Sequence, residues 1–281
     1  MKNQTPQKFI LWIAVTAFVA LAFLFAVMDL QIMQRYSNPN SDWAHYFEAY
    51  GQLPGMLTGF LGGLLSLRFV LQQETRKKSL RTIGTIILYG LLTLFLAFGF
   101  WGDAMGMQIG ADVNFALVTV LALLSLIVGQ VILSRISGEN LQSLKPFART
   151  ALWLFFLVNI LVWAFKISWG RMTYRNILAA GDLSLFSPWY LPQGNTGNHS
   201  FISGHTAIGF CVLPITMLFR NQPKQHTIAW IVVLLFGIMS AVSRVVIGAH
   251  FPSDVLFSTG ITLLLFLFLQ QRFLRNGELE K

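Results

Sequence analysis

Eight apolar runs separated by short polar segments constrain this chain more than any other feature of its sequence. An α-helix crosses the hydrocarbon core of a bilayer in about 20 predominantly apolar residues. The runs are Phe9–Leu30, Leu53–Leu71, Thr82–Trp101, Asn114–Leu133, Ala151–Phe165, His205–Phe219, Ile228–Ile247 and Val255–Phe268. The fifth, sixth and eighth runs are short, so we expect their helices to extend beyond the apolar residues. The predicted fold is all-α, a polytopic bundle of about eight transmembrane helices.

Composition excludes most other classes of protein. Hydrophobic residues make up 55% of the 281 residues and charged residues 11%, whereas an average soluble chain carries about 25% charged residues. A soluble globular enzyme, a disordered chain or a coiled coil would need more charge on its exterior. The one cysteine, Cys211, excludes an intramolecular disulfide bond and a zinc site built on cysteines. The chain is therefore expected to be an integral membrane protein.

The distribution of Lys and Arg predicts how the chain is oriented. Cytoplasmic loops are enriched in these residues, and with the N-terminus inside, 15 of the 20 fall on the cytoplasmic side. The outer side holds the other 5, which are Arg35, Lys166, Arg171, Arg175 and Arg244. We expect both termini in the cytoplasm and the protein in the plasma (inner) membrane. The net charge of +9 then reflects membrane boundaries rather than binding to nucleic acid.

The first outer loop, Gln31–Gln52, carries several aromatic residues among polar ones. They are Tyr36, Trp43, Tyr46, Phe47 and Tyr50. Aromatic rings gather at membrane–water interfaces, where they sit at the level of the headgroups. We expect an interfacial belt here, formed by a short amphipathic helix on the bilayer, with direct contact to a substrate as the alternative.

Three outer segments carry ionisable side chains, although Lys and Arg are normally rare on the outer side of a membrane protein. Lys166–Arg175 follows the fifth run, Asn198–Thr206 enters the sixth, and Ser243–Asp254 joins the last two. Because the predicted topology places all three at the same face, they can converge. An ionisable group near membrane depth indicates a functional site by default.

The residues in these segments suit chemistry on a dianionic group. Arg and Lys can clamp phosphoryl oxygens without a metal or cofactor. Ser203, Gly204 and His205 open a helix whose free N–H groups favour an anion. Asp254 lies one turn after His250 and can fix the tautomer of its imidazole, which leaves the other nitrogen free to attack. His205 is then available as the general acid.

Each of these features also has a structural interpretation when it is taken alone. A His–Asp pair at this spacing is more often a structural hydrogen bond, and Arg171 and Arg175 can anchor lipid headgroups. The three segments together, on one face, favour a functional site.

At these residues the chain resembles the type 2 phosphatidic acid phosphatase superfamily. That family has a three-part signature: Lys-x6-Arg-Pro, then Pro-Ser-Gly-His, then Ser-Arg-x5-His-x3-Asp. The third part is matched in full, by Ser243, Arg244, His250 and Asp254. The second part is matched by Ser203, Gly204 and His205, with Ile202 in place of Pro.

The first part of the signature is matched only by Lys166, because Thr173 and Tyr174 stand where the family has Arg-Pro. Arg171 and Arg175 flank the expected position, and we favour Arg171 over Arg175 as the replacement. The resemblance covers residues 148–274. It implies a six-helix phosphatase core within residues 76–281, preceded by two extra transmembrane helices and their outer loop in residues 1–75.

The resemblance also implies a function. Membrane members of the family remove phosphate from lipid phosphates or pyrophosphates without a metal. Carried over, His250 forms a phosphohistidine, Asp254 orients it, and His205 protonates the leaving group. Lys166, Arg171, Arg244 and the Ser203–Gly204 backbone would then hold the phosphoryl oxygens.

Several alternatives fit the same residues. A lipid phosphotransferase would share the phosphohistidine, with a second lipid as acceptor in place of water. A non-catalytic transporter of polar lipids or anions, or a family member that only binds lipid phosphate, would show no turnover. The substrate also stays open among undecaprenyl pyrophosphate, phosphatidylglycerol phosphate, phosphatidate and lipid A phosphates.

Overall fold

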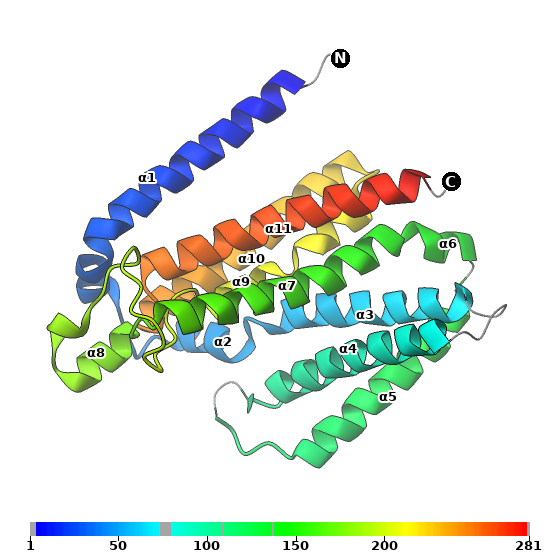
Figure 1. Cartoon of the computed structure of the whole chain (residues 1–281), viewed down its shortest axis with the longest axis horizontal. Helices are drawn as coiled ribbons and strands as arrows, with labels where there is room; N and C mark the ends of the chain where they lie inside the picture. Colours follow the sequence, from blue (N-terminus) through cyan, green and yellow to red (C-terminus); the bar gives the residue numbers. More distant parts are fainter. Residues whose placement is uncertain (1–3, 74–79, 108–109, 137, 280–281) are drawn as a thin grey trace.

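The computed structural model describes residues 4–73, 80–107, 110–136 and 138–279. Within these ranges the chain is helical and contains no strand, which confirms the predicted all-α fold (Figure 1). The α-helices are α1 (Gln4–Tyr36), α2 (Asp42–Tyr50), α3 (Leu53–Gln73), α4 (Leu80–Ala104), α5 (Phe115–Ser134), α6 (Gly138–Ser143), α7 (Lys145–Trp169), α8 (Tyr174–Ala180), α9 (Gly204–Phe210), α10 (Pro223–Val246) and α11 (Pro252–Leu279). Two 3-10 helices accompany them, η2 (Leu183–Leu185) and η3 (Leu213–Phe219).

Among the described residues, 7 helical stretches are long and apolar enough to cross a membrane. They cover Trp12–Tyr36, Asp42–Gln72, Ile83–Ala104, Phe115–Ser134, Lys145–Ala180, Pro223–Val246 and Pro252–Arg275. These stretches account for all of the predicted runs except His205–Phe219. Two of the short runs extend as expected, since Ala151–Phe165 lies within α7 and Val255–Phe268 within α11.

The run His205–Phe219 is not one helix, and the expectation that it would be extended is wrong. It forms the short α9 followed by η3. Pro214 has no N–H and cannot donate to the carbonyl of Phe210, so an α-helix cannot continue through it. A 3-10 helix rises about 2.0 Å per residue, against about 1.5 Å for an α-helix. The 3-10 helix therefore lets this short run span a greater distance with the same number of residues.

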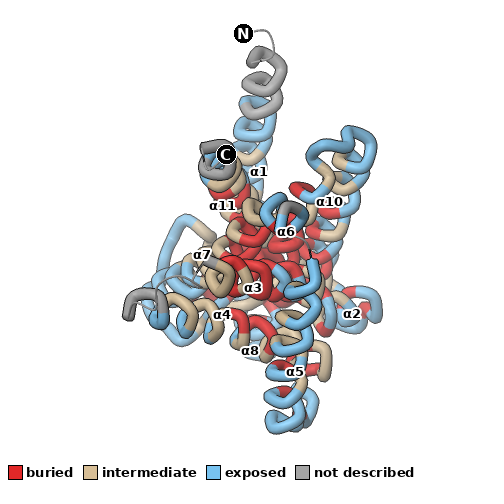
Figure 2. The backbone as a smooth tube through the Cα atoms, turned by 90° about the vertical axis from the view of Figure 1, so that its right-hand side faces the viewer, coloured by how far each residue is buried: buried red, intermediate tan, exposed pale blue. Residues whose placement is uncertain are grey.

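Helix α3 lies between α4 and α7 in the centre of the bundle (Figure 1). Figure 2 shows buried residues concentrated on α3 and its neighbours, whereas α1 and α5 are largely exposed. Glycines on α3 allow this close packing. A Cβ at Gly55 would lie 1.9 Å from the Ile208 carbonyl oxygen of α9, and one at Gly63 would lie 2.9 Å from Thr93 Oγ1 of α4. The α4–α5 hairpin lies outside α3, while the domain division at residue 75 stays a prediction.

The three predicted outer segments meet at one end of the bundle, on the left of Figure 1. The end of α7, the start of α9 and the junction between α10 and α11 all lie there, together with α2 and α8. The short helix expected in the first outer loop is present as α2, with Trp43 and Tyr46 exposed. Its other face packs against α10, where the rings of Phe47 and Phe236 lie 5.8 Å apart.

Candidate active site

His250 and Asp254 lie at the junction of α10 and α11. Helix α11 begins at Pro252, whose missing N–H is not needed in a first turn. Asp254 accepts a hydrogen bond from the backbone N–H of Phe251 at 2.9 Å, which fixes the carboxylate at the helix start. His250 Nδ1 lies 3.5 Å from Asp254 Oδ2, so the predicted spacing does bring the two side chains together.

The surroundings of His250 keep its imidazole neutral. Burial lowers the pKa of His250 to about 4, although Asp254 opposes the shift. At neutral pH the ring therefore carries one N–H and one lone pair. With the N–H on Nδ1, facing Asp254, the lone pair lies on Nε2. Nε2 is then the nitrogen that can act as a nucleophile.

The Asp254 carboxylate is fully buried and held from several sides. Ser200 Oγ donates to Oδ2 at 2.5 Å, and Arg171 Nη1 donates to Oδ1 at 2.7 Å. The two donors come from the loop before α9 and the segment after α7, so Asp254 ties both motif segments to α11. A carboxylate with this many donors has one orientation, and it presents Oδ2 to His250.

Arg244, near the end of α10, is 1% exposed and has only part of its guanidinium satisfied. Nη2 donates to Glu48 Oε1 at 2.8 Å. Within the described part of the chain, Nε and Nη1 of Arg244 are buried without a hydrogen-bond partner. Leaving a buried donor unsatisfied costs about 1–3 kcal/mol, and more when the group is charged. An anion bound here would satisfy both nitrogens.

Two further motif residues lie next to this arginine. His205 stands in the first turn of α9, and its Nε2 is buried without a partner among the described residues. Lys166 lies in the last turn of α7, with Nζ 5.5 Å from the centre of the Trp163 ring. Gly204 lies beside this lysine, since a Cβ there would be in ordinary van der Waals contact with Nζ, at 3.7 Å.

Ser203 is the N-cap of α9, as its residue type predicts. Its Oγ accepts from the backbone N–H of Thr206 at 3.3 Å. Its own backbone N–H donates to the Asp254 carbonyl at 3.3 Å, and its carbonyl accepts from Ser258 Oγ at 2.9 Å. Ser203 thus attaches the start of α9, where His205 lies, to the start of α11.

Arg171 contacts Asp254 at Oδ1, whereas His250 faces Oδ2. Gly170 ends α7 with a positive φ of 53°, and a Cβ there would lie 2.0 Å from the Gly194 carbonyl oxygen, so only glycine fits this turn. The turn directs Arg171 into the protein, where it is 1% exposed. Its guanidinium lies 4.0 Å above the Phe251 ring.

Four hydrogen bonds occupy the Arg171 guanidinium. Nε donates to the Ser187 carbonyl at 2.7 Å, and Nη2 donates to Asp29 Oδ2 at 2.9 Å. Nη1 donates to both Ser253 Oγ at 2.8 Å and Asp254 Oδ1 at 2.7 Å. An arginine has five N–H donors, so little of this side chain remains for a phosphoryl group.

Arg175 and Thr173 differ from Arg171 in exposure and role. Thr173 is the N-cap of α8, where its Oγ1 accepts from the Asn176 backbone N–H at 3.3 Å. Threonine is a good N-cap, so Thr173 has a structural role at the position where the family signature has arginine. Arg175 lies in the first turn of α8 with half of its side chain exposed, and its Nη1 is 3.3 Å from Glu48 Oε1.

Two carboxylates in residues 1–75 belong to this cluster and were missed by the sequence analysis. Asp29 of α1 is buried and accepts from Arg171 and from both the backbone N–H and the hydroxyl of Ser253. Glu48 of α2 accepts from Arg244 and Arg175. Asp29 could have been noticed, because it stands inside an apolar run where an acid is rare. Glu48, in a polar loop, gave no such signal.

Comparisons with known proteins show what this part of the chain is similar to. Residues 147–278 match the model of the PAP2 superfamily. Phosphatidylglycerophosphatase B of Bacillus subtilis (strain 168) is 32% identical over 84 residues, which cover 28% of this chain and 41% of that protein. Undecaprenyl-diphosphatase BcrC of the same organism is 41% identical over 70 residues, which cover 25% of this chain and 33% of that protein.

The alignments span less than half the length of both curated relatives. No solved structure matches the chain. The family match contains every residue of the second and third motifs, as well as Lys166 and the arginines beside Thr173. The match to the PAP2 superfamily thus covers residues 147–278, a little under half of the chain, and contains the candidate site motifs.

Proposed function

We propose that this protein hydrolyses a phosphate or pyrophosphate group of a membrane lipid, through a phosphohistidine on His250 and without a metal. One observation carries the proposal. Four buried nitrogens, Arg244 Nε, Arg244 Nη1, His205 Nε2 and His250 Nδ1, have no hydrogen-bond partner among the described residues, although His250 Nδ1 lies 3.5 Å from Asp254 Oδ2. Such a group favours a bound dianion.

The residues divide the reaction into two steps. His250 Nε2 attacks phosphorus, and the bond from phosphorus to the leaving oxygen breaks. His205, whose protonated form the bound dianion stabilises, gives its proton to that oxygen. Water then attacks the phosphohistidine, His205 takes a proton from the water, and inorganic phosphate leaves. Lys166 and Arg244 offset the negative charge that grows on the phosphoryl oxygens.

In the proposed reaction, the positive charges of Lys166 and Arg244 neutralise the phosphoryl group as a metal ion would. Lys166 and Arg244 face the phosphoryl position, and among the residues that the structure describes no three His, Cys, Asp or Glu side chains gather as metal ligands. The proposed substrate is a lipid whose phosphate group reaches this end of the bundle. The Ser203–Gly204 backbone adds its dipoles beside Lys166.

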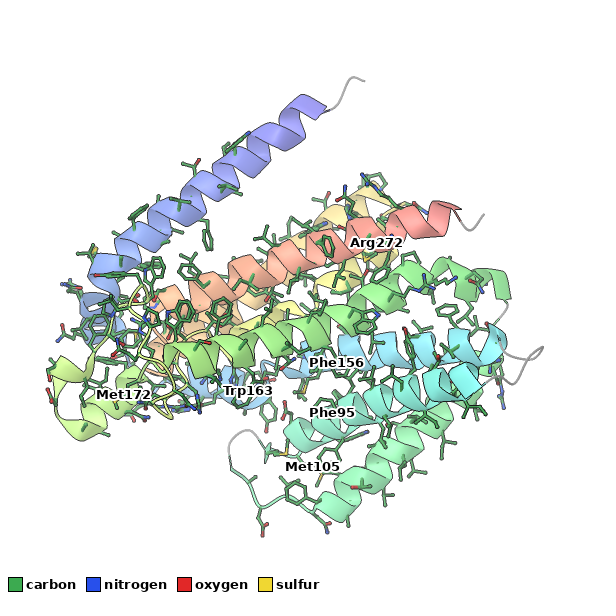
Figure 3. All side chains as sticks on the ribbon, viewed as in Figure 1. Phe95, Met105, Phe156, Trp163, Met172 and Arg272 are labelled. Atoms are coloured by element: carbon green, nitrogen blue, oxygen red, sulfur yellow. The ribbon has the colours of Figure 1, made fainter. Side chains whose placement is uncertain are left out.

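We also propose that the site lies at the outer face of the membrane. The site end and the basic end of the bundle are opposite, as Met172 and Arg272 show in Figure 3. Cytoplasmic ends are the ones enriched in Lys and Arg. Five basic residues counted toward the cytoplasmic side lie outside the described residues, namely Lys2, Arg76, Lys77, Lys78 and Lys281. At the site end, Arg171, Arg175 and Arg244 are paired with carboxylates, so their charge is largely offset.

Phosphate release tests the proposal. Purified protein in detergent is given phosphatidate, phosphatidylglycerol phosphate or undecaprenyl pyrophosphate in the presence of EDTA. We expect inorganic phosphate from at least one of them, none from His250→Ala, and full activity in the control His226→Ala, whose ring lies at the far end of α10. Loss of activity on EDTA that is restored by Mg²⁺ would contradict the metal-free reaction. Consumption of the lipid without release of phosphate would indicate a phosphotransferase.

A further inference from the structure

An acid stands inside the apolar part of α1. Asp29 lies within the stretch Trp12–Tyr36, about two turns before its outer end. A carboxylate in such a stretch is costly unless it faces the protein interior and has partners there. Asp29 is 1% exposed, whereas Val27 and Met28 beside it are 72% and 41% exposed. Helix α1 therefore directs this acid into the bundle while its neighbours face outward.

The hydrogen bonds that Asp29 accepts within the described part of the chain all come from two motif segments. Oδ1 accepts from the Ser253 backbone N–H at 3.0 Å, and Oδ2 accepts from Arg171 Nη2 at 2.9 Å and from the Ser253 hydroxyl. Ser253 directly precedes Asp254, and Arg171 also donates to Asp254. Asp29 thus holds two residues that fix the position of the acid facing His250.

Asp29 determines how the Arg171 guanidinium is shared. Nη2 donates to Asp29, and Nη1 donates to Asp254 Oδ1 at 2.7 Å. With Nη1 on Oδ1, the other oxygen of Asp254 faces His250 Nδ1 at 3.5 Å. An arginine that meets a single carboxylate favours a bidentate pair, in which both branches of the fork bind both oxygens. Such a pair would draw Oδ2 of Asp254 away from His250.

Asp29 also offsets the charge of Arg171. The side chains of Arg171, Asp29 and Asp254 are at most 1% exposed, so water screens their charges little. A guanidinium beside Asp254 reduces the negative potential that His250 experiences, and a second carboxylate on the guanidinium restores it. Asp254 can then stabilise the positive charge that develops on the His250 ring when Nε2 attacks phosphorus.

Other contacts hold α1 at the same place. Met33, one turn after Asp29, is buried in an apolar cluster with Phe251. The Trp189 indole donates to the Ala22 carbonyl at 3.1 Å. Figure 1 shows α1 meeting the bundle at the site end and diverging from α11 toward its N-terminus. Apolar packing can hold a helix without the desolvation of a charge, so the presence of the acid favours a role in the site.

We propose that Asp29 is a positioning residue for the reaction, because its hold on Arg171 and Ser253 keeps Asp254 in the orientation that His250 requires. The proposal rests on the proposed function and adds to it a residue from outside residues 147–278, the segment that matches the family. Asp29 acts through its partners and does not touch the phosphoryl group. The motifs alone are then an incomplete site, which α1 completes.

Asp29→Asn is the first test. The amide keeps the size of the side chain, but it has no charge, and its NH₂ group would face the donors of Arg171 or Ser253. We expect kcat for a lipid phosphate to fall about tenfold, the effect of about one lost hydrogen bond between charged groups. KM should stay the same, because the proposed phosphate ligands are unchanged. An unchanged kcat overturns the proposal.

Phe18→Ala is the matched control on the same helix. The Phe18 ring lies 5.4 Å from the Phe257 ring of α11, so its removal loosens the contact between α1 and α11 and leaves the polar network intact. We expect a lower temperature of thermal unfolding and an unchanged kcat. If Phe18→Ala lowers kcat as much as Asp29→Asn does, docking of α1 accounts for the effect and the proposal is wrong.

A double-mutant cycle tests whether Asp29 acts through Arg171. Once Arg171 is replaced by alanine, the loss of Asp29 should have no further effect, so kcat of the double variant should equal that of Arg171→Ala within about twofold. Losses that multiply would mean independent roles and would overturn the proposal. If Asp29→Asn does not fold, Asp29→Glu takes its place in the cycle, since it keeps the charge but displaces the carboxylate.

The tautomer of His250 gives a measurement that needs no turnover. In protein labelled with ¹⁵N in the histidine rings, NMR chemical shifts report which ring nitrogen carries the proton, and the His250 signals are those absent from His250→Ala. We expect the proton on Nδ1 in the wild type and in Phe18→Ala, and a mixture of tautomers in Asp29→Asn. A mixture in the wild type, or no change in Asp29→Asn, overturns the proposal. If no lipid releases phosphate but the tautomer depends on Asp29, the proposed hydrolysis fails and the positioning role stands.

Discussion

Arg171 Nη1 lies 2.7 Å from Asp254 Oδ1, and Arg171 Nη2 lies 2.9 Å from Asp29 Oδ2. One arginine therefore holds two buried carboxylates, and one of these orients the proposed nucleophile. From this arrangement we propose that Arg171 acts as a positioning residue for Asp254 rather than as a direct ligand of phosphate.

The first prediction follows from that position. Arg171→Ala should lower kcat/KM for a lipid phosphate about 100-fold, through kcat rather than KM, because Asp254 loses its anchor while Lys166 and Arg244 still bind the phosphate. Arg171→Lys keeps the charge but loses the planar fork, and it should restore less than a tenth of the activity. Steady-state kinetics on both variants measure the split.

Arg175→Ala is the matched control for Arg171. Half of the Arg175 side chain is exposed, and its contact with Glu48 is 3.3 Å long. Exposed ion pairs contribute about 0–1 kcal/mol, so kcat/KM should fall less than about tenfold. A rise in KM for Arg171→Ala with an unchanged kcat would instead make Arg171 a phosphate ligand.

A second prediction concerns Glu48, which holds Arg244 Nη2 at 2.8 Å. Glu48→Gln keeps an acceptor but removes the charge, and a hydrogen bond to a charged group is worth about 1.5–3 kcal/mol. We expect kcat to fall about tenfold while KM does not rise, because Arg244 keeps its charge but loses its orientation. Asp42→Asn, an exposed change in the same helix, should leave both constants unchanged. A several-fold increase in KM at constant kcat argues against this role.

A third prediction uses the pKa of His250, which burial lowers to about 4. In the unfolded chain a histidine titrates near pH 6.5, at about its reference pKa. Between these values the unfolded state binds more protons than the folded state, so stability falls as the pH falls from about 6.5 to about 4. Thermal unfolding in detergent should show that His250→Asn loses less stability than the wild type over this range. Parallel curves for the two proteins would mean that His250 is not held neutral.

The fourth prediction concerns orientation. In a Cys211→Ser background, a membrane-impermeant maleimide added to intact cells should label Asn195→Cys, in the exposed loop between η2 and α9, but not Gln225→Cys at the start of α10. Both should react once the membrane is broken, which controls for exposure. The reverse pattern would place the site in the cytoplasm.

Local patterns in the sequence predicted most of the helices and motif positions. The lengths of the apolar runs are nearly sufficient to predict α1, α3, α4, α5 and α10, because a helix needs about 20 apolar residues to cross a bilayer. The spacing of His250 and Asp254 predicted their contact, which forms between the residue two positions before α11 and the first turn of that helix. Hydropathy could not predict the break before Pro214, because it does not register a missing backbone donor.

The contacts between side chains of distant helices could not be predicted from the sequence. Nothing local indicates that Asp29 meets Arg171, which is 142 residues away, or that Glu48 meets Arg244, which is 196 residues away. The direction of the Arg171 side chain was likewise open, because the turn at Gly170 and not the motif spacing decides where it points. Tertiary packing, rather than the motif spacing, therefore decides that Arg171 lies against Asp29 and Asp254.

The hydrogen bonds between Asp29 and Ser253 join residues 224 positions apart, and this distance has a consequence for biogenesis. Ribosomes add about 5–20 residues per second, so Asp29 enters the membrane about 10–45 seconds before Ser253 is made. During that interval the first helix carries an acid without its final partners. The site closes only when the last helix docks against the first, so truncation within α11 should leave a membrane-inserted chain that never becomes active.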